Sequence, residues 1–213
     1  NLANAICEDY GVTLFEVLTG FKYIGEKIQQ FEDSGEYTFL FGFEESYGYL
    51  SGTAVRDKDA VNAAVLVAEA ASVCLKEGIT LFDRLQQIYA RYGYYDEMTW
   101  SGTYPGKEGA EQIKSIMARL HDESPESIGG TKVLAKRDYL KGLETSGQGS
   151  APLLFPPSDV VYFKLDRHFW TCVRPSGTEP KIKFYAGASH PGSLQDAKEA
   201  CAQLLEAFKQ LAK

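Results

Sequence analysis

The chain has 213 residues, of which 44% are hydrophobic and 24% are charged, and its formal net charge is −7. This composition is typical of a globular protein with a sizeable core, and no run of eighteen apolar residues is present to cross a bilayer. A nucleic-acid-binding domain normally carries a basic cluster, which this sequence lacks. The four cysteines form no CxxC pair, which disfavours a zinc or thioredoxin-type site and predicts free thiols in a reducing cytoplasm.

Helical patterns dominate the first hundred residues. We expect helices over residues 2–10, 21–31, 59–76 and 80–91. The helix over 59–76 is so rich in alanine and valine that it should be mostly buried, and Gly78 supplies its C-cap. Residues 12–18 are rich in β-forming types, and residues 37–41 predict a short buried strand. This alternation of strand and helix favours an α/β layer.

The second half has a different pattern, and a stretch rich in tyrosine, glycine and threonine indicates a domain boundary near residue 100. A helix is expected over 107–121, and a last helix starts at Ser193. Strands are expected over residues 131–135, 160–165, 169–173 and 181–186. Glycine, proline and serine over 142–158 indicate a loop. We therefore predict two domains, 1–100 and 101–213, and the second is a smaller α+β domain.

The strongest local signal is the segment 174–180 (Arg-Pro-Ser-Gly-Thr-Glu-Pro), which lies between two predicted strands. A phosphate needs several donors that converge on one spot. Arg174 supplies a planar fork, and Ser176 and Thr178 supply hydroxyls. Gly177 allows a close approach to the backbone N–H. The same residues also fit an ordinary polar hairpin turn, and chemistry alone does not decide between the two readings.

Two further segments carry charges in suggestive positions. Residues 42–48 (Gly-Phe-Glu-Glu-Ser-Tyr-Gly) follow an apolar run, and their carboxylates and hydroxyl suit sugar hydroxyls, although a solvated strand exit is the simpler alternative. Residues 56–59 (Arg-Asp-Lys-Asp) precede the long helix, which Asp57 or Asp59 could cap. Lys58 could act as an acid, a base or a charge clamp. Solvated charges at a capped helix start are the alternative there.

Neither the histidines nor the Ser189-His190 pair indicates a catalytic centre. Adjacent residues rarely face each other, so Ser189 and His190 are not expected to act as nucleophile and base. His121, His168 and His190 lack metal-ligand spacing. No acidic metal-binding loop is present, and we predict no metal ligand in this sequence.

Taken together, four segments occur in the order typical of the α-phosphohexomutase family, which the chain resembles over nearly its whole length. The matching segments are residues 19–25 (Thr-Gly-Phe-Lys-Tyr-Ile-Gly, similar to the substrate loop of the third domain), 42–48 (sugar-binding loop), 56–59 (basic motif) and 174–180 (phosphate-binding loop of the fourth domain). The Glu-Glu-Ser form of the sugar-binding loop is more similar to the phosphoglucomutase branch than to the phosphomannomutase or phosphoglucosamine mutase branches.

This resemblance implies a role for individual residues. The residues implied to bind phosphate are Arg174, Ser176, Gly177 and Thr178, with Lys183 as a weaker candidate. The residues implied to bind the sugar are Glu44 and Ser46, with further contacts from Thr19 and Gly20. Lys58 is implied to shuttle a proton or to stabilise charge.

The resemblance also implies an activity. Enzymes of this family interconvert sugar phosphates such as glucose 1-phosphate and glucose 6-phosphate through a phosphoserine and a bisphosphate intermediate, with Mg²⁺ as the metal and glucose 1,6-bisphosphate as the activator. The family's phosphoserine loop (Thr-x-Ser-His-Asn-Pro) and its aspartate-rich magnesium loop do not occur in this sequence. We therefore expect an incomplete three-layer α/β domain, the third domain without its first strand, followed by a fourth domain with a mostly antiparallel sheet.

Such a chain should be inactive alone and should act on a hexose phosphate together with the N-terminal half of the same polypeptide. A phosphomannomutase or a phosphopentomutase of the same family is an alternative, because phosphopentomutases have a similar sugar-binding loop. A non-catalytic module that binds phosphosugars is a further alternative. No nucleic-acid or membrane partner is expected.

Overall fold

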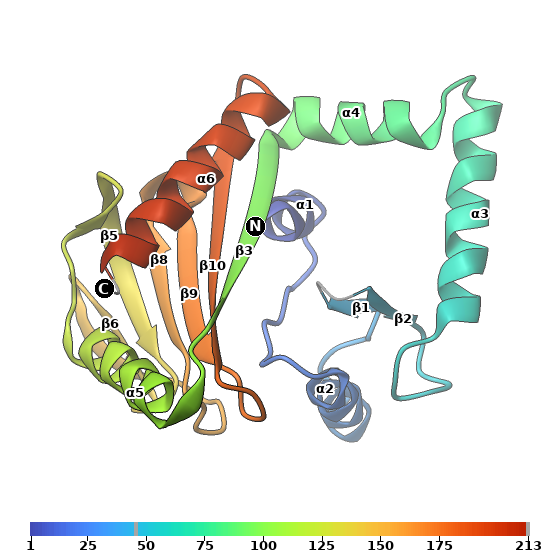
Figure 1. The fold of residues 1–213 in the computed structure, drawn as a ribbon. Helices are drawn as coiled ribbons and strands as arrows, with labels where there is room; N and C mark the ends of the chain where they lie inside the picture. The colour runs from blue at the N-terminus through green and yellow to red at the C-terminus, as the bar shows by residue number, and fades with distance from the viewer. Residues whose placement is uncertain (45–46, 212–213) are drawn as a thin grey trace. The chain divides into compact units, whose positions relative to one another are not determined.

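The structure is a computed structural model, and it describes residues 1–44 and 47–211 (Figure 1). Contacts divide the chain into two compact units. We call Thr13–Ile88 the small unit, and we call Asn1–Val12 together with Tyr89–Lys213 the sheet unit. Across the described residues, no helix is both long and apolar enough to span a bilayer.

The small unit contains helices and a two-stranded antiparallel ribbon. Its elements are α2 (Phe21–Ser34), β1 (Phe41–Glu44), β2 (Gly48–Ser51), α3 (Ala60–Lys76) and most of α4 (Leu81–Tyr92). Its core consists of four buried apolar side chains, Phe21, Ile24, Ile28 and Leu50. Three of them recur at helical spacing on α2, so the amphipathic helix predicted over 21–31 is confirmed.

Two β-rich segments of the chain are irregular. Residues 12–18 form no strand, and the buried strand predicted over 37–41 is wrong, because pairing begins only at Phe41 and both Tyr37 and Leu40 are exposed. A β-rich run becomes a strand only where a neighbouring strand accepts its backbone hydrogen bonds. Nothing in the described part of the chain pairs with either segment.

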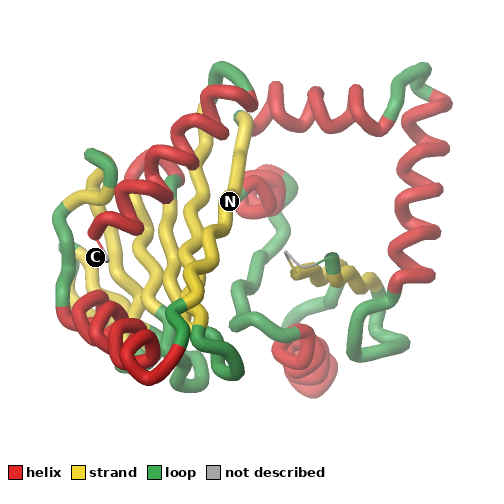
Figure 2. Tube along the Cα trace, viewed as in Figure 1, coloured by secondary structure: helices red, strands yellow, loops and turns green. Residues whose placement is uncertain are grey.

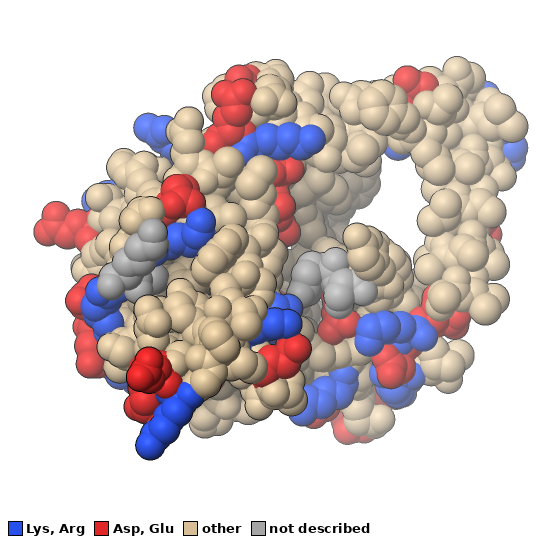
Figure 3. Space-filling model, in the orientation of Figure 1, with Lys and Arg blue, Asp and Glu red and all other residues tan. Residues whose placement is uncertain are grey.

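Helix α3 is exposed, although its alanine- and valine-rich sequence predicts burial. Cys74 is its buried residue, while Val61 and Leu75 are 77% and 78% exposed. The visible side of α3 carries almost no charged side chains (Figure 3). The prediction is wrong because burial of an apolar helix also requires a neighbouring element that covers it, and the composition of the helix does not report such an element. Within the small unit, α3 packs against β2.

The helix ends follow the capping signals in the sequence. The carboxylate of Asp59 accepts the N–H of Asn62 at 2.9 Å and caps α3. Thr80 and Asp83 form a reciprocal capping box at the start of α4, with bonds of 2.8 Å and 3.1 Å. The hydrogen bonds from Thr80 hold the pKa of Asp83 below its usual value. This capping box fixes the start of the helix that the sequence predicts over 80–91, which is confirmed.

The sheet unit is built around an eight-stranded sheet. Its strands are β3 (Tyr94–Thr103), β4 (Ser127–Ile128), β5 (Thr131–Asp138), β6 (Leu143–Ser146), β7 (Gly149–Pro152), β8 (Val161–Leu165), β9 (Trp170–Pro175) and β10 (Lys181–His190). They pair antiparallel in the order β3-β10-β9-β8-β5-β6-β7, with β4 beside β5. Helices α5 (Gly106–Asp122) and α6 (Leu194–Leu211) lie on the same face of this sheet (Figures 1 and 2). The predicted α/β fold class with a mostly antiparallel sheet is confirmed. The remaining elements are α1 (Leu2–Asp9), which confirms the first predicted helix, and the short turn η1 (Asp166–His168).

Strands β3, β6 and β7 are among those that lie where the sequence predicts none. Strand β3 pairs with β10 along its whole length, in the stretch expected to separate two domains. Strands β6 and β7 form a hairpin inside the loop expected over 142–158. Both are largely exposed, so they lack the apolar alternation that reveals a strand. The domain boundary predicted near residue 100 stays a prediction.

Alternation along β9 and β10 sorts their side chains between two faces of the sheet. Val173, Ile182 and Phe184 are buried in the core that the sheet forms with α5 and α6. Because successive side chains of a strand point to opposite faces, Arg174 and Lys183 lie on the outer face, which these helices do not cover. The predicted phosphate-binding residues of both strands therefore share one face.

The structure shows no disulfide between the four described cysteines. Cys74 and Cys201 are buried, and Cys7 and Cys172 are half-buried. Burial raises the pKa of the Cys201 thiol to about 12. This thiol therefore stays protonated and unreactive near neutral pH.

Candidate substrate-binding residues

The segment between β9 and β10 is a compact turn whose own hydrogen bonds fix its shape. The N–H of Ser176 donates to the carbonyl oxygen of Lys181 at 2.8 Å. The hydroxyl oxygen of Ser176 accepts the N–H groups of Thr178 and Glu179 at 3.4 Å and 3.2 Å. Such serine turns hold a loop without any ligand. The loop is thus preformed, and it leaves Gly177 and Thr178 exposed.

Arg174 is held by one edge of its guanidinium group. Its Nε donates to the hydroxyl oxygen of Tyr185 at 3.1 Å, and the guanidinium carbon lies 5.9 Å from the centre of the Tyr185 ring. No described residue bonds the two terminal nitrogens. These nitrogens form the planar fork that matches two oxygens of a phosphate. Tyr185 therefore orients Arg174 and leaves its recognition edge available.

Lys183 lies directly opposite Arg174 in the ladder between β9 and β10. In such a pair the Cβ atoms are about 5 Å apart, and two like charges destabilise the sheet. Among the described residues, neither side chain forms an ion pair with a carboxylate. The unbalanced positive charge beside the preformed loop suits a phosphate, which would neutralise it.

In the small unit, Glu44 connects residues from three of the segments singled out in the sequence. Its side chain is only 10% exposed. One carboxylate oxygen accepts the N–H of Gly20 at 3.0 Å, and the other lies 3.3 Å from Nζ of Lys58. Gly20 has a φ of 129°, which favours glycine at this position. Glu44 is therefore fixed by partners from both sides.

Lys58 has a charge that its neighbours stabilise. Desolvation lowers the pKa of Lys58, but the hydrogen bond and charge of Glu44 and the charge of Asp57 outweigh it, so the pKa lies above its ordinary value. Lys58 therefore acts as a donor or a positive charge near neutral pH rather than as a base. A Cβ atom at position 48 would lie 2.8 Å from Cε of Lys58. Gly48 thus makes room for this side chain.

The structure brings the predicted residues together in two groups, one in each unit. Gly20 and Lys58 both contact Glu44 in the small unit, and Thr19 lies exposed beside Gly20. Arg174, Ser176, Gly177, Thr178 and Lys183 lie at one end of the β9–β10 hairpin in the sheet unit. Ser46 lies outside the described residues.

Two aromatic residues contact the candidate binding residues although the sequence motifs assign no role to them. Tyr185 follows Lys183 by two residues, so strand alternation alone would place it on the same face. Phe21 begins α2, and its ring centre lies 5.0 Å from Nζ of Lys58. Helical spacing assigns Phe21 to the core and gives no sign of this second contact.

The described residues contain no cluster of three or more histidine, cysteine, aspartate or glutamate side chains that could hold a metal ion. The magnesium ion that the family resemblance implies does not fit the residues placed here. These two groups of residues can therefore recognise a ligand through hydrogen bonds and charge.

Comparison with known proteins gives matches along most of the chain. A family model described as "Phosphoglucomutase/phosphomannomutase, alpha/beta/alpha domain III" matches residues 1–92. A phosphoglucomutase from Staphylococcus haemolyticus is 38% identical over 186 residues, which cover 86% of this chain and 33% of the relative. A phosphoglucomutase from Staphylococcus aureus is 40% identical over 192 residues, which cover 89% of this chain and 34% of the relative. The chain thus spans about a third of the length of these relatives.

Among solved structures, the open form of the exocytosis-sensitive phosphoprotein pp63/parafusin, a phosphoglucomutase from Paramecium, superposes with a TM-score of 0.64. The similarity covers 98% of this chain and 34% of that protein, with 20% sequence identity. At this identity the match supports the fold alone.

Proposed function

Because the chain is a phosphoglucomutase-like member of the phosphoglucomutase/phosphomannomutase family and corresponds to its C-terminal region, we propose that it supplies sugar and phosphate recognition to an enzyme that interconverts glucose 1-phosphate and glucose 6-phosphate. One observation carries this proposal. Arg174 and Lys183 face each other beside a preformed loop, with no carboxylate paired to either among the described residues.

In this proposal, each group of residues recognises a different part of a sugar phosphate. The loop and its two cations hold the phosphate that does not react, through charge-assisted hydrogen bonds. Glu44 accepts hydrogen bonds from sugar hydroxyls, and Lys58 donates to a sugar or leaving-group oxygen. Since Glu44 is held by Gly20 and Lys58 before any sugar arrives, little ordering is needed when it binds.

The transfer itself is assigned to other parts of the same polypeptide. In this proposal those parts supply a phosphoserine, which passes its phosphoryl group through a bisphosphate intermediate, and a Mg²⁺ ion, which neutralises charge on the transferring group. This chain keeps the non-reacting end of the substrate in place. Contacts with the phosphate rather than with the sugar suit this role, because the bisphosphate must bind in two orientations.

Replacing Glu44 by glutamine, or Ser46 by alanine, should reduce discrimination among hexose phosphates and leave the affinity for inorganic phosphate unchanged. A site that pairs hydrogen bonds with hydroxyls disfavours analogues that leave its buried groups unpaired. Calorimetric titration of the chain with glucose 1-phosphate, mannose 1-phosphate and inorganic phosphate measures both effects.

Glu111→Gln is a matched control, because Glu111 is an exposed carboxylate on α5 that pairs with Lys114. This variant should titrate like the unchanged chain. If Glu44→Gln lost phosphate affinity and sugar preference to the same extent, the division of roles between the two groups would be wrong.

A further inference from the structure

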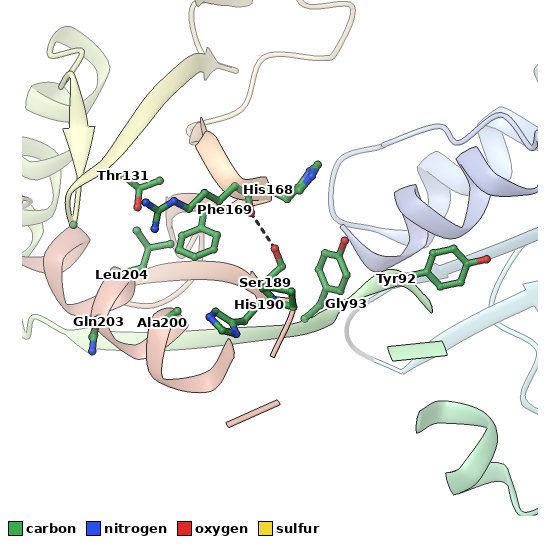
Figure 4. A pocket seen from close by; sticks show the side chains of 14 residues that line it. Tyr92, Gly93, Thr131, His168, Phe169, Ser189, His190, Ala200, Gln203 and Leu204 are labelled. Carbon is green, nitrogen blue, oxygen red and sulfur yellow. Dashed lines mark hydrogen bonds between the residues drawn. The ribbon is translucent and has the colours of Figure 1, made fainter. Parts of the chain in front are cut away.

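The sheet unit contains a cavity of about 600 Å³ at the other end of the β9–β10 hairpin (Figure 4). Its wall comes from turn η1, the end of β10 and helix α6, and it includes Arg167, Phe169, Ser189, His190, Gln203 and Leu204. A cavity of this size suits a small ligand. None of the residues assigned above to sugar or phosphate lines it.

This cavity is remote from the proposed phosphate loop. Strand β10 has ten residues, with Lys181 at the loop end and His190 at the cavity end. At about 3.3 Å per residue, the two ends lie about 30 Å apart. A molecule of substrate size in the cavity cannot touch Arg174, so the two places are separate sites.

The turn at the cavity mouth has an unusual backbone that its surroundings fix. Arg167 and His168 have φ values of 59° and 61°, which residues with a Cβ atom rarely adopt. Asp166 accepts the N–H of Arg167 through its side chain at 2.8 Å. The hydroxyl of Ser189 donates to the carbonyl oxygen of Arg167 at 2.9 Å (Figure 4). Ser189 therefore holds the turn and does not form a nucleophilic pair with His190.

The wall combines a free cation with an apolar floor. Among the described residues, no carboxylate pairs with the guanidinium group of Arg167. Phe169 and Leu204 are buried and lie next to each other in Figure 4. His190 accepts the N–H of Gly192 through Nδ1 at 3.0 Å and lies 3.4 Å from Asp196. The Asp166 carboxylate is thus bonded to a backbone N–H, and the Asp196 carboxylate lies beside His190.

We infer that this cavity is a second ligand site, which binds a small organic phosphate with a flat ring. Arg167 holds the phosphate with its planar fork. The ring packs on Phe169 and Leu204, away from water. A carboxylate would use only two of the donors, whereas a phosphate offers three terminal oxygens.

Histidine NMR provides a site-specific test, because the chain has only three histidines. Adenosine 5′-monophosphate, adenosine and inorganic phosphate are titrated into the full chain while the imidazole carbon-bound proton signals are followed. Comparison with His190→Gln identifies the His190 signal. We expect adenosine monophosphate to move the His190 signal to saturation, with at least tenfold weaker binding of adenosine or phosphate alone. The signal of buried His121 should stay in place and report that the chain is folded.

Arg167→Gln should weaken the binding of adenosine monophosphate at this cavity at least tenfold, while Arg174→Ala should leave it unchanged. The different effects of these two variants distinguish a wrong assignment of the cavity from a wrong assignment of the proposed sugar-phosphate site. The inference is overturned if the His190 signal does not move at millimolar nucleotide. It is also overturned if Arg167→Gln, with His121 unchanged, binds the nucleotide as tightly as before, or if phosphate alone binds equally well.

Discussion

Replacing Arg174 by alanine should weaken the binding of inorganic phosphate or glucose 1-phosphate to this chain about tenfold to a hundredfold, since a charge-assisted hydrogen bond contributes roughly 1.5–3 kcal/mol. The terminal nitrogens of Arg174 are the recognition edge, and the variant removes both. Arg174→Lys keeps the charge and loses the planar fork, so it should recover only part of the affinity. Calorimetric titration measures all three chains under one salt condition.

Tyr185→Phe serves as a companion to this test, because it removes the hydroxyl that Nε of Arg174 contacts and keeps the ring. It should weaken phosphate binding less than Arg174→Ala does. Equal phosphate affinity for Arg174→Ala and the unchanged chain would remove this loop from the phosphate site.

Replacing His121 by alanine should lower the free energy of unfolding of the sheet unit by about 3–5 kcal/mol. His121 lies in the last turn of α5, and its two ring nitrogens lie 2.8 Å from carboxylate oxygens of Asp138 and Asp159. The side chains of His121 and Asp138 are only 7% and 6% exposed. The variant would leave the Asp138 carboxylate buried with one partner lost. For a chain of this size the melting temperature should fall by about 6–20 °C.

Asp159→Asn is the matched control on the other side of the same ring, because the Asp159 side chain is 45% exposed. Exposed pairs contribute about 0–1 kcal/mol, so this variant should unfold within that range of the unchanged chain. Urea unfolding followed by circular dichroism distinguishes the two. Equal free energies of unfolding for His121→Ala and Asp159→Asn would show that the buried pair of His121 and Asp138 contributes no more than the exposed pair.

The cluster around His121 also explains how α5 is fastened to the sheet. Lys136 on β5 donates to the carbonyl oxygens of His121 and Glu123, both at 2.7 Å, and Lys141 donates to the same His121 oxygen at 2.8 Å. These bonds satisfy carbonyl groups that every helix leaves unpaired at its C-terminus. Burial lowers the pKa of Lys136. The sequence gives no sign of this cluster, since its members lie far apart along the chain.

Local signals in the sequence predict the helices and their ends well. The start of the helix at residue 80 and the apolar spacing on α2 depend on local residues, and both helices are confirmed. Burial of α3 and pairing of residues 37–41 depend on distant partners, and both predictions are wrong. Strand β3 is the opposite case, because its pairing with β10 makes a strand of a stretch that the sequence predicts as a domain boundary.

The candidate site shows the same division between local and distant information. The loop after Arg174 is readable from its residues, and strand alternation places Lys183 on the same face. The contact of Glu44 with Gly20 joins residues 24 positions apart, so only the family resemblance could suggest it. The cavity beside Arg167 combines η1, β10 and α6, and no motif marks it.

In our proposal this chain recognises a sugar phosphate but needs the rest of the polypeptide for phosphoryl transfer. An activity assay tests this by mixing the purified chain with glucose 1-phosphate, glucose 1,6-bisphosphate and Mg²⁺ and following the formation of glucose 6-phosphate. We expect no turnover above a protein-free control, and turnover once the N-terminal half of the polypeptide is added. Turnover by the chain alone, abolished by Ser189→Ala, would contradict it.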